Sequence, residues 1–121
     1  MINISEATKI NEVIKLIKIV KSTNDKKKYE AHFLLDNDKI KIVRFGQAKA
    51  RDFPLINDKS SPFYLPKVLD RNVVKASYLR RHEKREDWTN PLTAGALSRW
   101  ILWSRPTLKG AISAFKKKFK L

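Results

Sequence analysis

The chain has 121 residues, with 27 Lys and Arg against 12 Asp and Glu, so its formal net charge is +15 at pH 7. It contains no cysteine, which excludes disulfides and thiolate metal sites. No apolar run approaches the roughly 20 residues that cross a bilayer, and the N-terminal sequence lacks the basic and apolar regions of a signal peptide. We therefore expect one soluble, intracellular domain without a membrane span.

The positive charge is spread along the sequence rather than gathered in a tail. Lys and Arg alternate with Ile, Val, Leu, Phe and Trp over most of the chain, whereas a disordered basic tail is poor in apolar residues. This pattern indicates a folded body with a positive surface. Such a surface attracts nucleic acid, an anionic membrane or an acidic protein, and charge alone does not choose among them.

Three strands are predicted in the first half of the chain. Residues 1–14 fit either an extended arm or a short helix capped by Ser5. The β-branched and aromatic runs that follow are separated by polar turns, and they span residues 15–21, 29–35 and 39–45. This arrangement predicts an antiparallel meander that ends at Gly46.

The strand at 29–35 alternates with a period of two, so its apolar residues share one face. These residues are Tyr29, Ala31, Phe33 and Leu35. Glu30 and His32 lie on the other face, where we expect His32 to be solvated rather than a metal ligand. The residues 36–38 that follow resemble the start of a calcium loop, but the required glycine and distal glutamate are missing, so we interpret them as a hairpin turn.

Residues 47–66 are predicted to form a long irregular connection, because they contain Pro54, Pro62 and Pro66. An unanchored loop of this length is unusual in a compact domain. We therefore expect its aromatic residues to pin it to the core, and these are Phe53, Phe63 and Tyr64.

A helix is expected to begin at Pro66 or Lys67 and to continue into the charged residues 80–87. Its predicted apolar stripe consists of Val68, Leu69, Val73, Ala76 and Leu79.

Two further helices are predicted near the C-terminus. Asn90-Pro91 is a start signal, and the helix from Leu92 to Trp103 is apolar nearly all round, so we expect it to be the most buried element. Pro106 repeats the start signal for a final helix, whose apolar stripe is Leu108, Ala111, Ile112, Phe115 and Phe119. The predicted fold is therefore α+β, a three-stranded antiparallel sheet packed against about three helices, with residues 15–121 forming a single domain.

The sequence holds few groups suited to catalysis. The two histidines, His32 and His82, have no cysteine or carboxylate at metal-ligand spacing. The three glycines do not form a phosphate-binding loop, and Glu86-Asp87 suits helix capping. We expect no enzyme activity, no metal and no cofactor.

Clusters of basic residues are the candidate sites for a polyanion or an acidic partner. They are Lys26, Lys27 and Lys28, then Arg80, Arg81, Lys84 and Arg85, and finally Lys116, Lys117, Lys118 and Lys120. The alternative is a solvated face on which Glu83 and Glu86 pair locally at helical spacing.

Arg99 lies between apolar positions beside Trp100 and Trp103. We interpret it as a stacked guanidinium with a structural role in a cation–π contact or an ion pair. Trp88, Trp100 and Trp103 also fit a base-stacking platform, but core packing is the interpretation that we favour.

The C-terminal block resembles a family of small basic proteins encoded by large DNA viruses of algae and amoebae, of the chlorella-virus and mimivirus type. The resemblance is carried by the run 82–88, by residues 90–103 with the tryptophans, by Pro-Thr-Leu at 106–108 and by Phe-Lys-Lys-Lys-Phe at 115–119. Lys27-Lys28-Tyr29, Phe45-Gly46 and Asp52-Phe53 extend it over about residues 15–120. The segment 54–78 departs from it, being longer and more hydrophobic, which suggests a partner-specific insertion.

The resemblance implies a viral protein without an assigned catalytic role, so no functional residues are carried over. It implies two functions. The first, which we favour here, is a minor capsid or assembly component of the virion whose basic surface binds acidic viral structural proteins. The second is sequence-tolerant binding of the viral genome or transcripts, as DNA or RNA. In either case we expect the protein in the virion, and in the host cytoplasm or nucleus during assembly.

Overall fold

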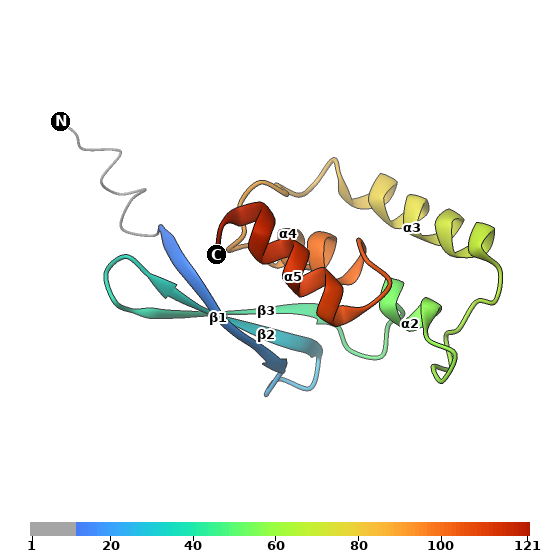
Figure 1. The fold of residues 1–121 in the computed structure, drawn as a ribbon, viewed down its shortest axis with the longest axis horizontal. Coiled ribbons are helices and arrows are strands. Elements are labelled where there is room, and N and C mark those ends of the chain that lie inside the picture. The colour runs from blue at the N-terminus through green and yellow to red at the C-terminus, as the bar shows by residue number, and fades with distance from the viewer. Residues whose placement is uncertain (1–11) are drawn as a thin grey trace.

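The computed structural model of the chain describes residues 12–121, which form a three-stranded sheet followed by helices (Figure 1). The strands are β1 (Val13–Lys21), β2 (Lys27–Leu35) and β3 (Ile40–Gln47), and they pair antiparallel in this order. The predicted meander and the α+β class are therefore confirmed. The predicted arm or helix at residues 1–14 falls largely on residues 1–11, outside the described part, but Val13 and Ile14 belong to β1.

Strand β1 is built from three repeats of two apolar residues and a lysine, Val-Ile-Lys, Leu-Ile-Lys and Ile-Val-Lys. Its pairing with β2 shifts twice, between Val13 and Lys15 and between Leu16 and Lys18. Each such bulge adds a residue to one strand. As a result Leu16 lies opposite Phe33 and Ile19 opposite Ala31, so residues three apart both face the core.

The side of the sheet that faces the core carries the apolar residues that the period-two pattern of residues 29–35 predicted. Ala31 and Phe33 of β2 and Phe45 of β3 are fully buried. The ring of Tyr29 lies 5.9 Å from that of Phe45, to which its strand position is paired. The alternating pattern of residues 29–35 is therefore confirmed.

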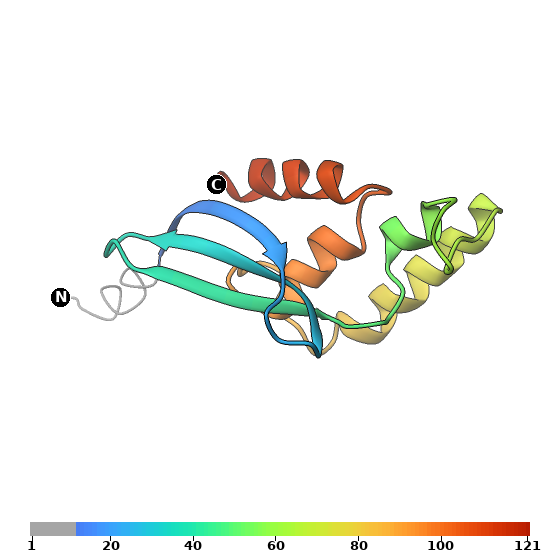
Figure 2. The same ribbon diagram turned by 90° about the horizontal axis from the view of Figure 1, so that it is seen from below.

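The helices are α2 (Phe53–Asn57), α3 (Val68–His82), α4 (Ala94–Leu97), which continues into the π-helical turn η1 (Ser98–Leu102), and α5 (Leu108–Phe119). They cover one side of the sheet and extend past its end (Figure 2). Helices α4, η1 and α5 supply Leu97, Ile101, Leu102 and Phe115 to the core. The α5 stripe and the burial of the Trp-rich helix are thus confirmed.

Several predicted helix ends were wrong, and side chains cap α4 and α5 at positions other than those predicted. Helix α3 ends at His82 rather than at residue 87. Thr93 caps α4 by accepting a hydrogen bond from Ala96 N–H, so the helix begins after Asn90-Pro91 rather than at it. Thr107 caps α5 in the same way, one residue after Pro106.

The connection at 47–66 is not wholly irregular, because it contains α2. Asp52 caps this helix by accepting a hydrogen bond from Leu55 N–H at 2.9 Å. Phe53 and Ile56 are buried, and Phe63 packs against the same core. The predicted anchoring of the segment by aromatic residues is therefore confirmed for Phe53 and Phe63.

Four of the five residues in the apolar stripe predicted for α3 face solvent, which corrects the prediction, whereas Leu79 packs against the core. Val68, Leu69 and Val73 are 56–72% exposed. The inner face instead carries Val74 and Tyr78 together with two cations, Arg71 and Lys75.

These two cations are held by hydrogen bonds to neighbouring loops. Arg71 donates to the carbonyls of Leu65 and Pro66 and to Asn57 Oδ1. Lys75 donates to the carbonyl of Ser104 at 2.9 Å. Burial, followed by Arg99 and Arg105, lowers the pKa of Lys75. The inner face of α3 is therefore set by polar contacts that only the tertiary structure creates.

Arg99 is stacked, as predicted. Its guanidinium lies 4.1 Å from the ring centre of Trp100 and 5.3 Å from that of Trp88, and it donates to the carbonyl of Trp103 at 3.1 Å. Burial lowers the pKa of Arg99. Trp100 donates to the carbonyl of Trp88 at 2.8 Å, so the group ties η1 to the loop before α4.

No helix within residues 12–121 combines the length and the apolar character that a membrane span requires.

Candidate functional site

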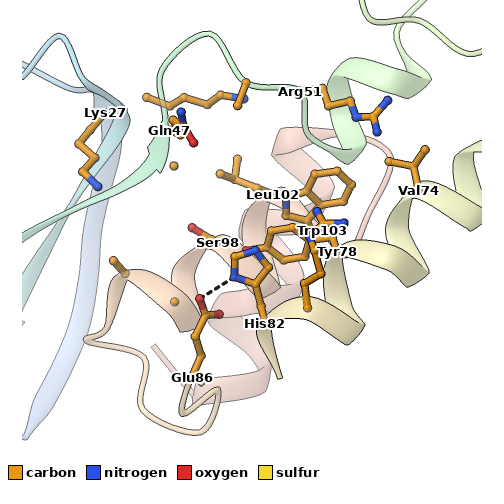
Figure 3. A pocket seen from close by; sticks show the side chains of 16 residues that line it. Lys27, Gln47, Arg51, Val74, Tyr78, His82, Glu86, Ser98, Leu102 and Trp103 are labelled. Carbon is orange, nitrogen blue, oxygen red and sulfur yellow. Dashed lines mark hydrogen bonds and ion pairs between the residues drawn. The ribbon is translucent and has the colours of Figure 1, made fainter. Parts of the chain in front are cut away.

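A cleft of about 370 Å³ lies where the end of the sheet meets α3 and the α4–η1 helix (Figure 3). The end of β3 contributes Gln47, the segment after it contributes Ala50 and Arg51, and the last turns of α3 contribute Tyr78, Arg81 and His82. Ser98 and Leu102 of η1 also line the cleft. Elements far apart in the sequence therefore build one concave surface.

Three stacked rings form one wall of the cleft. The ring of Tyr78 lies 4.5 Å from that of Trp103 at an interplanar angle of 12°, and 4.1 Å from that of His82 at 22°. Trp103 and Tyr78 are buried, whereas the His82 side chain is 37% exposed. The stack therefore reaches solvent at the His82 imidazole.

Cations without a carboxylate partner line the rim. Within the described part of the chain, no carboxylate lies at ion-pair distance from Lys27, Arg51 or Arg81. All three residues are exposed and all three line the cleft. Because they come from β2, the α2 connection and α3, the fold concentrates charge that the sequence distributes.

Lys28 also lines the cleft, but its charge is neutralised locally. Its ammonium lies 2.6 Å from Asp52 Oδ2, and the two side chains are only 12% and 4% exposed. Burial, followed by the charge of Asp52, raises the pKa of Tyr29. Lys28 therefore serves mainly to hold the sheet against α2.

Glu86 is the carboxylate that lines the cleft, and protein groups occupy both of its oxygens. One oxygen accepts from Trp88 Nε1 at 2.9 Å, and the other lies 2.9 Å from His82 Nδ1. A Cβ atom at Gly95 would lie 3.0 Å from the Glu86 carboxyl carbon, so glycine allows this close approach. The cleft therefore keeps a positive rim despite Glu86.

The cleft combines the neutral hydroxyl of Tyr78 with exposed cations. Burial, followed by the charge of Glu86, raises the pKa of Tyr78 to about 12, which keeps its hydroxyl neutral at physiological pH. Within residues 12–121, no three His, Asp or Glu side chains gather as a metal site would require. Three cations beside an aromatic stack form an environment for an anion that carries a flat apolar group.

The structure brings two of the predicted clusters together at this cleft. Lys27 and Lys28 of the first cluster and Arg81 of the second line it. The other residues of those clusters are exposed outside it, and they are Lys26, Arg80, Lys84 and Arg85. Glu86 pairs locally at helical spacing, as the alternative for this cluster expected, and its partner is His82, four residues earlier.

The third predicted cluster, on α5, does not line the cleft. Lys118 lies 4.3 Å from the ring centre of Trp100 and borders a smaller hollow of about 220 Å³ with Trp100 and Arg105. Lys117 and Lys120 are exposed, and Lys116 is half-buried.

Sequence reasoning missed Arg51, His82 and Gln47 as cleft residues. Arg51 is a single cation in a connection, so no cluster marked it. The signal that would have found it is Asp52-Phe53-Pro54, an N-cap followed by proline, which fixes the direction of the chain just after Arg51.

Comparison of the chain with protein-family models, with curated proteins and with solved structures finds no match.

Proposed function

We propose that this protein is a non-catalytic binding protein that holds the phosphate backbone of a nucleic acid in its basic cleft, with little regard for sequence. The observation that carries the proposal is the convergence of Lys27, Arg51 and Arg81 on the rim of one cleft. Phosphate contacts of this kind position a protein on nucleic acid without selecting sequence. The net charge of +15 adds a long-range attraction to the same partner.

The exposed imidazole of His82 supports single-stranded or unpaired nucleic acid as the preferred form. It ends a stack in which the inner rings are already covered by one another. A base stacks on such a ring regardless of its identity, because every base has a flat face. In this proposal the cations on the rim bind the adjoining phosphates.

The resemblance to proteins of large DNA viruses gives this proposal its setting, the viral genome or its transcripts. A role as a minor capsid or assembly component is a second candidate. One observation favours it specifically: the sheet exposes an apolar face that nucleic acid does not require. The two roles are compatible in a protein that joins nucleic acid to an assembly.

A salt titration tests the first proposal. Fluorescence anisotropy would follow the full chain binding to labelled single-stranded and duplex DNA of mixed sequence, between about 50 and 200 mM salt. We expect the logarithm of the affinity to fall linearly with the logarithm of salt, with a slope of about −2 on single-stranded DNA and about −2.7 on duplex DNA for three phosphate contacts. Negligible binding at physiological salt, or binding that does not change with salt, would refute the proposal.

A further inference from the structure

The second face of the sheet is apolar where a solvated face normally carries polar residues. We name it the open sheet face, and its large apolar residues are Ile14, Ile17 and Val20 of β1 and Ile40 and Ile42 of β3. These five side chains are 37–52% exposed. Contiguous exposed apolar residues of this kind mark interaction sites in soluble proteins.

The strand register places these residues in neighbouring rows on either side of β2. Ile40 lies opposite Leu34 of β2, and Ile42 lies opposite His32. On the other side of β2, Lys15 lies opposite Leu34 and Lys18 opposite His32. The two bulges in β1 place Ile14 and Ile17 beside these lysines, so two neighbouring rows cross the sheet with apolar side chains at both edges.

The next row of the sheet consists of Val20, Glu30 and Arg44, and its carboxylate, Glu30, already has hydrogen-bond partners. Glu30 is 5% exposed and lies 3.1 Å from Arg44 Nε and 3.2 Å from His32 Nε2. Thr23 donates to it from both its backbone N–H and its hydroxyl. A partner that covers this face therefore leaves the Glu30 carboxylate with its hydrogen bonds intact, which lowers the cost of burying it.

Charge selects among the candidate occupants. Lys15 and Lys18 lie within the apolar rows, so a second copy would set the same lysines against each other. Two chains that each carry +15 would also repel overall. An occupant with carboxylates beside its apolar residues would neutralise the lysines as it covers the isoleucines.

We propose that the open sheet face docks an acidic amphipathic helix of another protein. The apolar side of that helix would lie over Ile17 and Ile42, and its flanking carboxylates would meet Lys15 and Lys18. With α4, η1 and α5 on the first face, such a helix would complete a layer of helices on each side of the sheet, a stable way to bury both faces.

The test uses the full chain and a synthetic helical peptide of about 18 residues, with leucine on one side and glutamate flanking it. We expect Ile17→Ser with Ile42→Ser to weaken peptide binding by about tenfold or more in calorimetry. Val68→Ser with Leu69→Ser is the control, because it removes two apolar side chains from α3 that are even more exposed, at 61% and 72%, than Ile17 and Ile42. The control should bind the peptide as the unaltered chain does.

A second variant keeps the test decisive if the isoleucine variant unfolds. Lys15→Glu with Lys18→Glu should also weaken binding, and a peptide with lysine in place of glutamate should not bind the unaltered chain. Unchanged binding in these variants would overturn the proposal. So would binding to anionic vesicles without binding to the peptide, or a concentration-dependent dimer in sedimentation that the isoleucine variant abolishes.

The docking of a helix on the open sheet face and the binding of nucleic acid in the cleft can be tested independently. The isoleucine variant leaves Lys27, Arg51 and Arg81 in place, so its affinity for single-stranded DNA should equal that of the unaltered chain.

Discussion

Lys28 and Asp52 join the sheet to the helix that follows it, with the Lys28 ammonium 2.6 Å from one carboxylate oxygen of Asp52 while the other caps α2. Breaking a buried ion pair leaves an uncompensated charge. We expect Asp52→Asn, which can still cap the helix, to lower the free energy of unfolding by about 3 kcal/mol. Asp52→Ala should cost about 1 kcal/mol more, because it also removes the cap.

Urea denaturation with a constant m-value measures both changes. Lys28→Met combined with Asp52→Asn is the control, since it removes both charges and should recover part of the loss. No recovery in the double variant would mean that the pair does not account for the effect.

The cleft proposal predicts a specific change in salt dependence. Arg51→Ala and Arg81→Ala should each weaken DNA binding for all sequences and reduce the magnitude of the salt slope by about 1. Lys59→Ala removes an exposed cation outside the cleft and serves as the control. An equal loss with Lys59→Ala would show that binding is spread over the surface rather than centred on the cleft.

Helix α3 turns Lys75 toward the core and Leu69 toward solvent. We therefore expect Lys75 to contribute more to the free energy of unfolding than Leu69. Leu69 is 72% exposed, so Leu69→Ala should change the free energy of unfolding by less than about 0.5 kcal/mol. Lys75 donates to the Ser104 carbonyl and lies 4.8 Å from the ring centre of Phe53. Lys75→Ala should therefore destabilise by about 1–2 kcal/mol. Thermal unfolding of the two variants decides this, and the reverse order would contradict the assignment of the inner face.

The sequence predicted well those parts of the fold in which local pattern and burial agree. The meander and the α5 stripe follow periodicity, and the stacking of Arg99 follows from a cation set between tryptophans. It failed where long-range polar contacts decide, as at Arg71, whose partners are carbonyls of a loop that exists only in the folded chain. The cleft likewise escaped prediction, because Arg51 and Arg81 meet only through tertiary structure.

The Glu30 network predicts a loss of stability in acid. Burial alone would raise the pKa of Glu30, but hydrogen bonds from Thr23 and His32 and the charge of Arg44 together lower it below its ordinary value of 4.5. A lowered folded-state pKa stabilises the protein above the ordinary value, and this stabilisation is lost as the pH falls through the folded-state pKa. The window therefore lies below about pH 4.5.

Glu30→Gln tests this pH dependence. The unaltered chain should have the higher melting temperature at neutral pH, and the difference should shrink as the pH falls through that window. Glu83→Gln, which removes an exposed carboxylate on another element, corrects for the change in net charge. A difference that stays constant with pH would show that the Glu30 network does not depend on ionisation.

Gly46 lies next to the last residue of β3 and lines the cleft. We expect even its substitution by alanine to lower the free energy of unfolding markedly. Its φ of +80° is a conformation that other residues rarely adopt. An alanine Cβ would lie 2.8 Å from Leu102 Cδ1 and 3.2 Å from Lys28 Cβ. Gly46→Ala should therefore destabilise by about 2–3 kcal/mol, measured by urea denaturation, because strain and overpacking add.

A substitution at the next residue, Gln47, shows whether the loss of stability comes from backbone strain at Gly46 or from any change at the end of β3. Gln47 is exposed, so Gln47→Ala should stay within about 0.5 kcal/mol of the unaltered chain. Because Leu102 lies in the cleft wall, Gly46→Ala should also weaken DNA binding under conditions where the variant remains folded. A stable Gly46→Ala chain would mean that the backbone relaxes here and that contact with Leu102 does not shape the cleft.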